Sequence, residues 1–265
     1  MSLTKTEICQ HALEHIGSKV TLTDVDSDTS AEAIRCKSVY DFARDSLLRS
    51  HVWKFALVWA DLIRDAAAVT GTSSGSNGTT TLADTTKTWT LNQWYNYYVW
   101  ITGGTGSGQI RLIASNTTSE VLTVTQAWTT TPDETSTYEI WQYAPPTPWA
   151  YQYILPSDFM RLDSVDPSDA DFEIEGTRLK CDEDSLYVSY VRKVTDVTLF
   201  DAMFADVLAL KVATRIVMSL LRDKVLYRDL LAELGSALKV ARAVSRSEGF
   251  GSYDRPQTWN EARLG

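Results

Sequence analysis

The sequence has few cysteines, fewer basic than acidic residues and no long uncharged apolar run. Its three cysteines are odd in number and widely spaced, which favours free thiols in a reducing compartment over a disulfide framework. Lys and Arg number 25 against 34 Asp and Glu, and the resulting net charge of -9 argues against a sequence-reading DNA-binding protein. The apolar stretch 197–221 contains four charged side chains, so we expect no membrane span, and residues 1–17 lack the pattern of a secretory signal.

Two helices are predicted in residues 1–52. Thr4-x-x-Glu7 and Thr29-x-x-Glu32 are capping boxes, in which a hydroxyl and a carboxylate satisfy the free N–H groups of a first helical turn. Gly17 is a natural stop for the first helix. Apolar residues at helical spacing follow each box: Ile8, Ala12, Leu13 and Ile16, then Cys36, Val39, Tyr40, Ala43 and Leu47. Residues 52–59, rich in aromatic and β-branched side chains, predict a buried strand.

Two further helices are predicted near the C-terminal end. Thr198-x-x-Asp201 is a cap for a helix from Leu199 to about Leu221, which is apolar around most of its circumference and therefore needs cover on several sides. Such cover comes from the centre of a helical bundle or from a subunit interface. An amphipathic helix is expected at 224–247, and short strands are expected at 151–154, 172–174 and 186–191.

The middle of the chain differs in composition from both ends. In residues 65–143, 27 of 79 are Ser or Thr, and short alternating runs at 97–101, 109–113 and 120–125 are separated by Gly, Asn and Ser. We therefore expect an inserted all-β module. The predicted fold class is α+β, with a helical bundle from the N- and C-terminal helices and a few strands. The predicted divisions are 1–64 and 144–247 for the core, 65–143 for the insertion and 248–265 for an extended arm.

Two short motifs have partial metal-binding patterns. Residues 11–15 match H-x-x-E-H, in which two histidines one turn apart hold zinc, but the chain offers no clear third ligand. Residues 24–28 begin like a calcium loop, yet Thr29 and Arg35 occupy the positions of the required Gly and Glu. We interpret the first as solvated or interface-facing histidines and the second as a turn before a helix, so no metal site is predicted.

Three other features could be binding or catalytic sites, and we interpret each as part of the fold. Glycine-rich 103–108 precedes an alternating run, which predicts a hairpin turn and not a phosphate loop. Ten carboxylates between residues 155 and 185 could include an acid and base pair for glycoside cleavage, but such runs are typical of solvated turns. The tryptophans of the insertion could stack on sugars or bases, and we interpret them as its core: Trp89, Trp94, Trp100, Trp128 and Trp141. We expect no catalytic residue, no enzyme activity and no cofactor.

Several residue groups, in order and spacing, resemble a known family. The N-terminal group is Ile8, Leu13, Gly17, Tyr40, Trp53 and Phe55. Later segments at 151–158, 173–176, 186–191 and 199–205 continue the match. Over most of residues 5–245 the chain resembles the head-to-tail adaptor proteins of bacteriophages, the tail tubular protein A group of short-tailed phages and its relatives.

The resemblance implies a structural protein of the virion, made in the host bacterial cytoplasm and located at the portal vertex. Such adaptors form a homo-oligomeric ring, typically of twelve copies, which joins the portal protein to a tail tube, nozzle or tail-completion protein. Double-stranded DNA passes through the ring without sequence-specific binding. Because residues 155–185 carry ten acidic and three basic side chains, we expect acidic residues there to face the channel: Asp163, Asp166, Asp169 and Asp171.

The C-terminal arm is the second expected interaction site. It lacks periodicity but contains aromatic and arginine anchors, a composition typical of segments that order on a partner. Similar adaptors use this segment to grip the portal, which implies a portal-binding role for Tyr253, Arg255, Trp259 and Arg263. The alternative function is a virion-associated protein that binds glycans or hydrolyses peptidoglycan.

Overall fold

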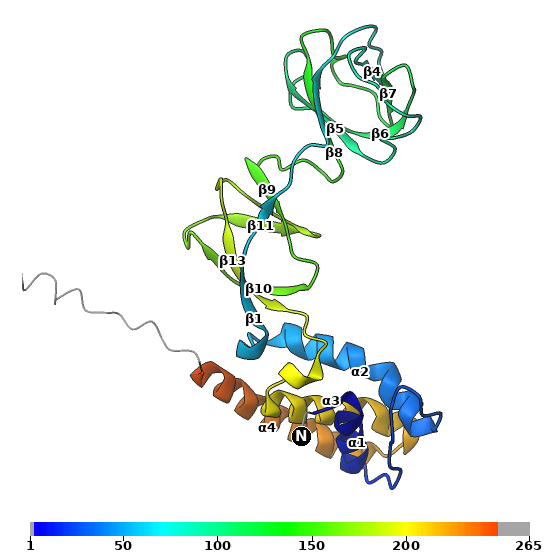
Figure 1. Cartoon of the computed structure of the whole chain (residues 1–265), viewed down its shortest axis with the longest axis vertical. Coiled ribbons are helices and arrows are strands. Elements are labelled where there is room, and N and C mark those ends of the chain that lie inside the picture. Colours follow the sequence, from blue (N-terminus) through cyan, green and yellow to red (C-terminus); the bar gives the residue numbers. More distant parts are fainter. Residues whose placement is uncertain (1–2, 249–265) are drawn as a thin grey trace, which may run out of the picture. The chain divides into compact units, whose positions relative to one another are not determined.

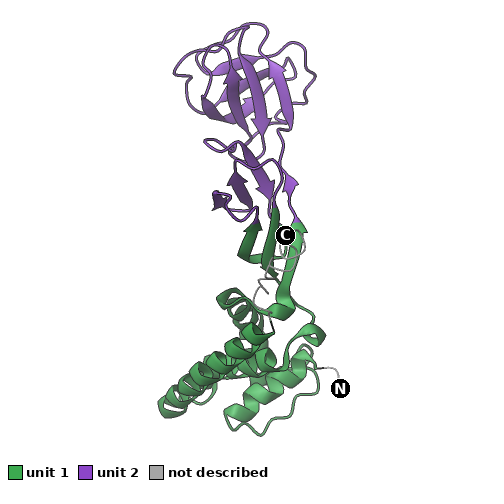
Figure 2. Ribbon diagram, turned by 90° about the vertical axis from the view of Figure 1, so that its left-hand side faces the viewer, with its two compact units in different colours: residues 1–60, 156–165, 187–265 green, residues 61–155, 166–186 purple. Residues whose placement is uncertain are grey.

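The computed structural model describes residues 3–248 and divides into two compact units (Figure 2). The first unit consists of 1–60, 156–165 and 187–265, and the second of 61–155 and 166–186. Helices account for 33% and strands for 26%, so the fold is of the mixed α+β kind, with several antiparallel sheets. The second unit contains the whole expected insertion, 65–143, together with strands on both sides of it.

The first unit contains all four α-helices found within residues 3–248 (Figure 1). They are α1 (Lys5–His15), α2 (Ala31–Ser50), α3 (Ala202–Leu220) and α4 (Lys224–Ser247). Helix α3 contacts each of the other three, and 11 of its 19 residues are buried. Because this helix is apolar on nearly every side, it can lie only where other elements cover it. The cover comes from helices of the same chain, which share one hydrophobic core with α3.

The first helix begins and ends as its sequence predicts. The Thr4 hydroxyl accepts a hydrogen bond from the Glu7 backbone N–H at 3.2 Å, and the Glu7 carboxylate accepts one from the Thr4 N–H at 2.7 Å. Gly17 has φ +71°, which a residue without Cβ adopts readily. The cap predicted for α2 is wrong by one residue. The N-cap is Ser30, whose hydroxyl accepts from the Ala33 N–H at 3.2 Å.

The predicted cap of α3 and the predicted strand at 52–59 also need correction. Thr198 lies in a short 3₁₀ helix, η2 (Val197–Leu199), and the N-cap is Asp201, whose carboxylate accepts from two backbone N–H groups. Residues 54–56 form a second 3₁₀ helix, η1 (Lys54–Ala56), and the strand β1 begins only at Leu57 and ends at Asp61. The indole of Trp53 is buried and donates to the Leu47 carbonyl at 2.9 Å. This contact holds Trp53 against the end of α2, so the chain turns at η1 before it extends into β1.

A three-stranded sheet completes the first unit, apart from Asp61 and Asp166 at its ends. Its order is β1, β13 (Tyr187–Arg192) and β10 (Phe159–Asp166). The sequence predicts β13 within one residue at each end but misses β10. In β10 apolar side chains alternate only weakly with charged ones, and none of its residues is fully buried. A strand at the edge of a sheet needs no strong pattern, which explains the omission.

The second unit contains two antiparallel sheets. The four-stranded one has the order β11 (Phe172–Glu175), β12 (Arg178–Cys181), β9 (Tyr151–Ile154) and β2 (Ile63–Arg64). Glu175 pairs with Arg178, and Gly176 between them has φ +59°, which confirms the turn predicted there. The six-stranded sheet has the order β3 (Val69–Thr72), β8 (Thr137–Trp141), β5 (Tyr98–Gly103), β6 (Ile110–Asn116), β7 (Val121–Val124) and β4 (Thr81–Ala83). The three runs predicted in the insertion correspond to β5, β6 and β7.

A buried carboxylate anchors the six-stranded sheet. The Asp84 side chain is fully buried and accepts hydrogen bonds from the Tyr138 hydroxyl at 2.7 Å and from the Thr86 backbone N–H at 3.0 Å. Burial alone raises the pKa of Asp84, but the hydrogen bonds from Thr86 and Tyr138 outweigh it and hold the pKa below its ordinary value of 3.8. The ionised form is therefore the one that this site stabilises.

The lowered pKa predicts a pH dependence for the second unit. A carboxylate with a depressed pKa stabilises the folded state fully above its unfolded pKa, and this contribution is lost as the pH falls through the folded pKa. We expect the thermal midpoint of the unit to fall below about pH 4. We also expect Asp84→Asn to make this dependence shallower, measured by near-UV circular dichroism between pH 7 and pH 3. Parallel curves for the two proteins would show that Asp84 does not contribute.

Candidate functional site

Five of the six N-terminal residues that carry the family resemblance come together in one core. Ile8, Leu13, Tyr40 and Trp53 are buried in the first unit, and Phe55 packs against them. Trp53 meets Phe204 of α3 edge to face, with the ring centroids 5.1 Å apart, and Phe55 meets the same ring at 4.9 Å. These residues hold the N-terminal helices against α3. Their arrangement is structural, so any interaction site must use side chains that this core leaves exposed.

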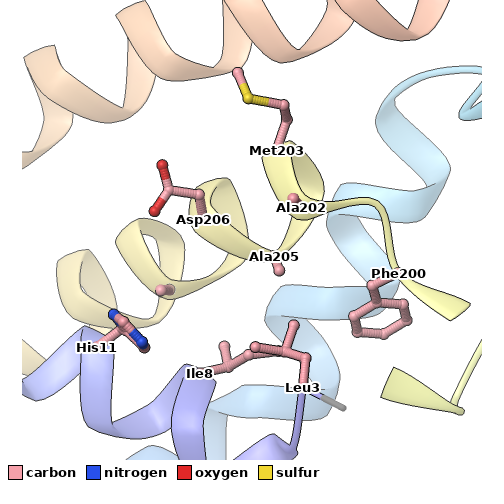
Figure 3. A pocket seen from close by; sticks show the side chains of 9 residues that line it. Leu3, Ile8, His11, Phe200, Ala202, Met203, Ala205 and Asp206 are labelled. Carbon is pink, nitrogen blue, oxygen red and sulfur yellow. The ribbon is translucent and has the colours of Figure 1, made fainter. Parts of the chain in front are cut away.

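One such site is an apolar pocket between α1 and α3, the α1–α3 pocket, with a volume of about 470 Å³ (Figure 3). Its apolar lining is Leu3, Ile8, Phe200, Ala202, Met203, Ala205 and Ala209. Two polar side chains, His11 and Asp206, also line it and belong to α1 and α3 respectively. Small alanines on α3 create the hollow, because they leave uncovered the space that a longer side chain would fill. The size is within the range of ligand pockets, about 300–1,000 Å³.

A second surface is formed by cations of α3 and α4 that lie against α2; we call it the basic strip. The guanidinium of Arg215 lies over the ring of Phe42, 4.5 Å from its centroid. One turn further along α2, the Lys211 ammonium donates to the Ser46 hydroxyl at 2.8 Å. Burial, together with the nearby Arg215 and Arg242 charges, lowers the pKa of Lys211.

The basic strip continues to the C-terminal end of α2. Arg242 of α4 donates to the Ser50 hydroxyl at 3.2 Å, which is the third contact at four-residue spacing along α2. His51, the residue after Ser50, is buried. Burial is the main cause that lowers the pKa of His51, and the charges of Arg242, Arg246 and other cations lower it further. Among residues 3–248, no carboxylate lies within 4.0 Å of the charged nitrogens of Lys211, Arg215 or Arg242.

A second pocket, the α3–α4 pocket, opens beside the basic strip. It has a volume of about 520 Å³, and its lining includes Lys211, Arg215, Met218, Tyr227 and Leu231. Met218 and Leu231 are exposed. Exposed apolar side chains next to arginine and aromatic groups are the composition of protein–protein interface centres.

Comparison with models of known protein families finds no match, and comparison with proteins of curated function finds none. The case for a function therefore depends on the surfaces of the two units and on the residues that carry the resemblance.

Charge is distributed very unequally between the two units. The first has 18 Lys and Arg against 17 Asp and Glu up to Glu248, a net of +1, and the second has 5 against 15, a net of -10. The sequence predicts a local acidic segment at 155–185 but not that the whole second unit is acidic. Assigning residues to units requires the contacts between segments, which composition along the chain does not supply.

The four predicted channel residues are all exposed, and they are divided between the two units. Asp163 lies on β10 in the first unit, where its carboxylate accepts from the Ser189 hydroxyl at 3.2 Å. Asp166, Asp169 and Asp171 belong to the second unit. The predicted portal-binding residues of the arm, Tyr253, Arg255, Trp259 and Arg263, lie outside the described residues.

The motifs considered as metal or phosphate sites form a helix surface, a turn and a hairpin loop in the structure. His11 is exposed and lies 3.7 Å from the Glu14 carboxylate. The carboxylate of Asp24 accepts a hydrogen bond from the Ser27 hydroxyl at 2.7 Å, within the turn expected before α2. This hydrogen bond lowers the pKa of Asp24. Residues 103–108 connect β5 and β6, as a hairpin should. No group of three or more His, Cys, Asp or Glu side chains within 3–248 is placed to hold a metal ion.

Four of the five tryptophans in the insertion are buried, and Trp100 is half-buried. Trp89, Trp94 and Trp128 share the hydrophobic core of the six-stranded sheet. Core filling is therefore confirmed for these three side chains, whereas Trp100 and Trp141 lie outside that core. None of the helices in the described part of the chain is long and apolar enough to cross a bilayer.

Sequence reasoning missed the basic strip. Its signal is present in the sequence as Phe42, Ser46 and Ser50 at four-residue spacing on α2, along one side of the apolar positions that mark the core face. The cations come from α3 and α4, more than 150 residues later, so only the packing of these helices reveals the strip.

Proposed function

We propose that this chain is the structural head-to-tail adaptor of a tailed bacteriophage. Copies form a ring, typically of twelve, at the portal vertex of the virion. The ring joins the portal protein to the tail and extends the channel through which double-stranded DNA leaves the capsid. The protein is made in the host cytoplasm and performs no catalysis in this role.

One observation carries the proposal. Helices from the two ends of the chain share a single core, and the buried members of the N-terminal resemblance group, Ile8, Leu13, Tyr40 and Trp53, lie in it. In an adaptor these helices would constitute the expected helical bundle. Because α3 is already covered by helices of its own chain, contacts between copies use the exposed pockets and the basic strip.

The charge of the second unit supports a role beside DNA. With a net charge of -10, its surface repels phosphates at distances within a Debye length, about 8–10 Å at physiological salt. A duplex that must slide through a channel moves most freely past a wall that does not bind it. Within the proposal, Asp166, Asp169 and Asp171 belong to this wall, as does Asp163 of the first unit, and the arm 248–265 grips the portal.

Electron microscopy tests the proposed function directly. We expect negatively stained images of the purified protein mixed with portal particles to show rings stacked coaxially on the portal, and immunogold labelling of virions to mark the portal vertex. An unrelated ring-shaped protein of similar size, mixed with the same portal particles, controls for nonspecific stacking. Virions that lack the protein, or that assemble infectious and leak-free without it, would contradict the proposal.

A further inference from the structure

The two pockets lie on opposite faces of α3. An α-helix turns through about 100° per residue, which places most of the α3 residues that line one pocket on the face opposite those that line the other. The opposed residues are Ala202, Asp206 and Ala209 of the α1–α3 pocket and Lys211, Arg215 and Met218 of the α3–α4 pocket, while Met203 and Thr214, which also line the pockets, lie between the two faces. The first set carries an acid and the second carries two bases. A single helix thus presents opposite charges in opposite directions.

On the basic side, a projecting aromatic side chain lies beside the second pocket. Phe42 is 64% exposed although it is a large apolar residue in the middle of α2. Arg215 packs over its ring and orients the guanidinium along the same face. Leaving a phenylalanine side chain in water is unfavourable relative to burying it. A partner that covers Phe42 would recover this free energy.

On the acidic side, the α1–α3 pocket offers a matching cavity. Its walls are apolar, with Phe200 and Leu3 on one side and α3 alanines on the other (Figure 3). Asp206 lines the pocket and is exposed, and no basic side chain among residues 3–248 lies within 4.0 Å of its carboxylate. The pocket therefore suits an aromatic group that arrives together with a cation.

We propose that the occupant of the α1–α3 pocket is a second copy of this chain: Phe42 of one copy inserts into the pocket of the next, and its Arg215 pairs with Asp206 there. This inference rests on the proposed function and names the contact between ring neighbours. Phe42 and the pocket are different surfaces, and Arg215 and Asp206 lie on opposite faces of α3, so the contact is heterologous and can repeat around an axis, as a closed ring requires. Aromatic and arginine anchors of this kind dominate the binding energy of interfaces.

Charge reversal on each side, followed by a combined swap, tests the contact. Arg215→Glu and Asp206→Arg should each weaken association between copies about 10-fold or more, because like charges then meet inside the interface. The double variant should recover rings, because the pair is restored with the charges exchanged. Phe42→Ala should weaken association comparably. The readout is the fraction of protein in rings, measured by mass photometry and negative-stain microscopy, alone and on portal particles.

A control variant separates this contact from general charge effects. Lys239→Glu changes the net charge by the same amount as Arg215→Glu. Lys239 is an exposed α4 residue that lines neither pocket. The Lys239→Glu variant should therefore form rings to the same extent as the unmodified protein. Far-UV circular dichroism and thermal midpoints of all variants show that the helices remain folded. Because the substituted side chains are exposed, we expect midpoints within a few degrees of the unmodified protein.

The possible outcomes distinguish this contact from the proposed function. Normal rings from both single variants would overturn the contact while leaving the adaptor function in place. Normal rings that fail to stack on portal would also overturn it and would assign the pocket to a portal segment. Loss of rings without recovery in the double variant would overturn the pairing of Arg215 with Asp206. If the unmodified protein forms no rings with or without portal, the proposed function and the contact are both wrong.

Discussion

Replacing Trp53 with alanine is expected to lower the free energy of unfolding of the first unit by about 3–5 kcal/mol, the usual cost of removing a buried tryptophan. The Trp53 side chain is 0% exposed and lies between His51 and Phe204, with ring centroids 5.0 Å and 5.1 Å away. Its indole N–H also satisfies the Leu47 carbonyl at the end of α2. The substitution therefore opens a cavity at the junction of α2 and α3 and removes one of two side-chain donors to the Leu47 carbonyl, leaving the Ser50 hydroxyl.

The measurement is urea unfolding followed by circular dichroism at 222 nm, which reports on the first unit because that unit contains all the described α-helices. Trp59→Ala is the matched control. Trp59 is 65% exposed on β1, so its loss should change the stability by about 0.5 kcal/mol or less. Similar effects of the two substitutions would show that Trp53 is not central to the core.

Replacing Gly104 with alanine is expected to destabilise the six-stranded sheet by about 2–5 kcal/mol, the sum of backbone strain and overpacking. Gly104 has φ +72°, and a Cβ at this position would lie 2.1 Å from the backbone carbonyl oxygen of Thr135. That oxygen belongs to the main chain and cannot rotate away as a flexible side chain would. The hairpin between β5 and β6 must therefore separate from the segment before β8.

Gly108 provides the control within the same hairpin. Its φ is +87°, but no atom lies within 4 Å of a Cβ built there. Gly108→Ala should cost only the strain of the left-handed backbone, about 1–2 kcal/mol. Thermal unfolding followed by the near-UV signal of the buried tryptophans measures both variants. Equal losses of stability in Gly104→Ala and Gly108→Ala would mean that the clash with the Thr135 carbonyl is relieved at no free-energy cost.

Much of the fold follows from local patterns in the sequence. Helix α4 has the bounds that its amphipathic pattern predicts, and α1 begins at the predicted capping box because Thr4 and Glu7 satisfy each other within one turn. The errors occur where competing local choices are nearly equal. Both Thr29 and Ser30 are able to cap α2, and the capping-box rule favours Thr29, whereas the backbone places Ser30 three residues before the free N–H of Ala33.

The candidate interaction site was less accessible to sequence reasoning. The sequence singles out His11 as a possible metal ligand, but the structure places it beside Asp206, almost 200 residues later, on the wall of an apolar pocket. Similarly, Phe42 looks like an ordinary member of an amphipathic helix until Arg215 is found over its ring. Both associations depend on tertiary packing, and neither involves residues close enough in sequence for a periodic pattern to detect.

The core of the first unit also has a consequence for biosynthesis. Trp53 and Phe55 pack on Phe204, so the N-terminal helices have no complete partner surface until the segment containing α3 has been translated. Residues 61–155 leave the ribosome before that segment and can form most of their strands first. This apolar surface is therefore completed only after residues 202–220 have been synthesised, which delays any encounter between folded first units until then.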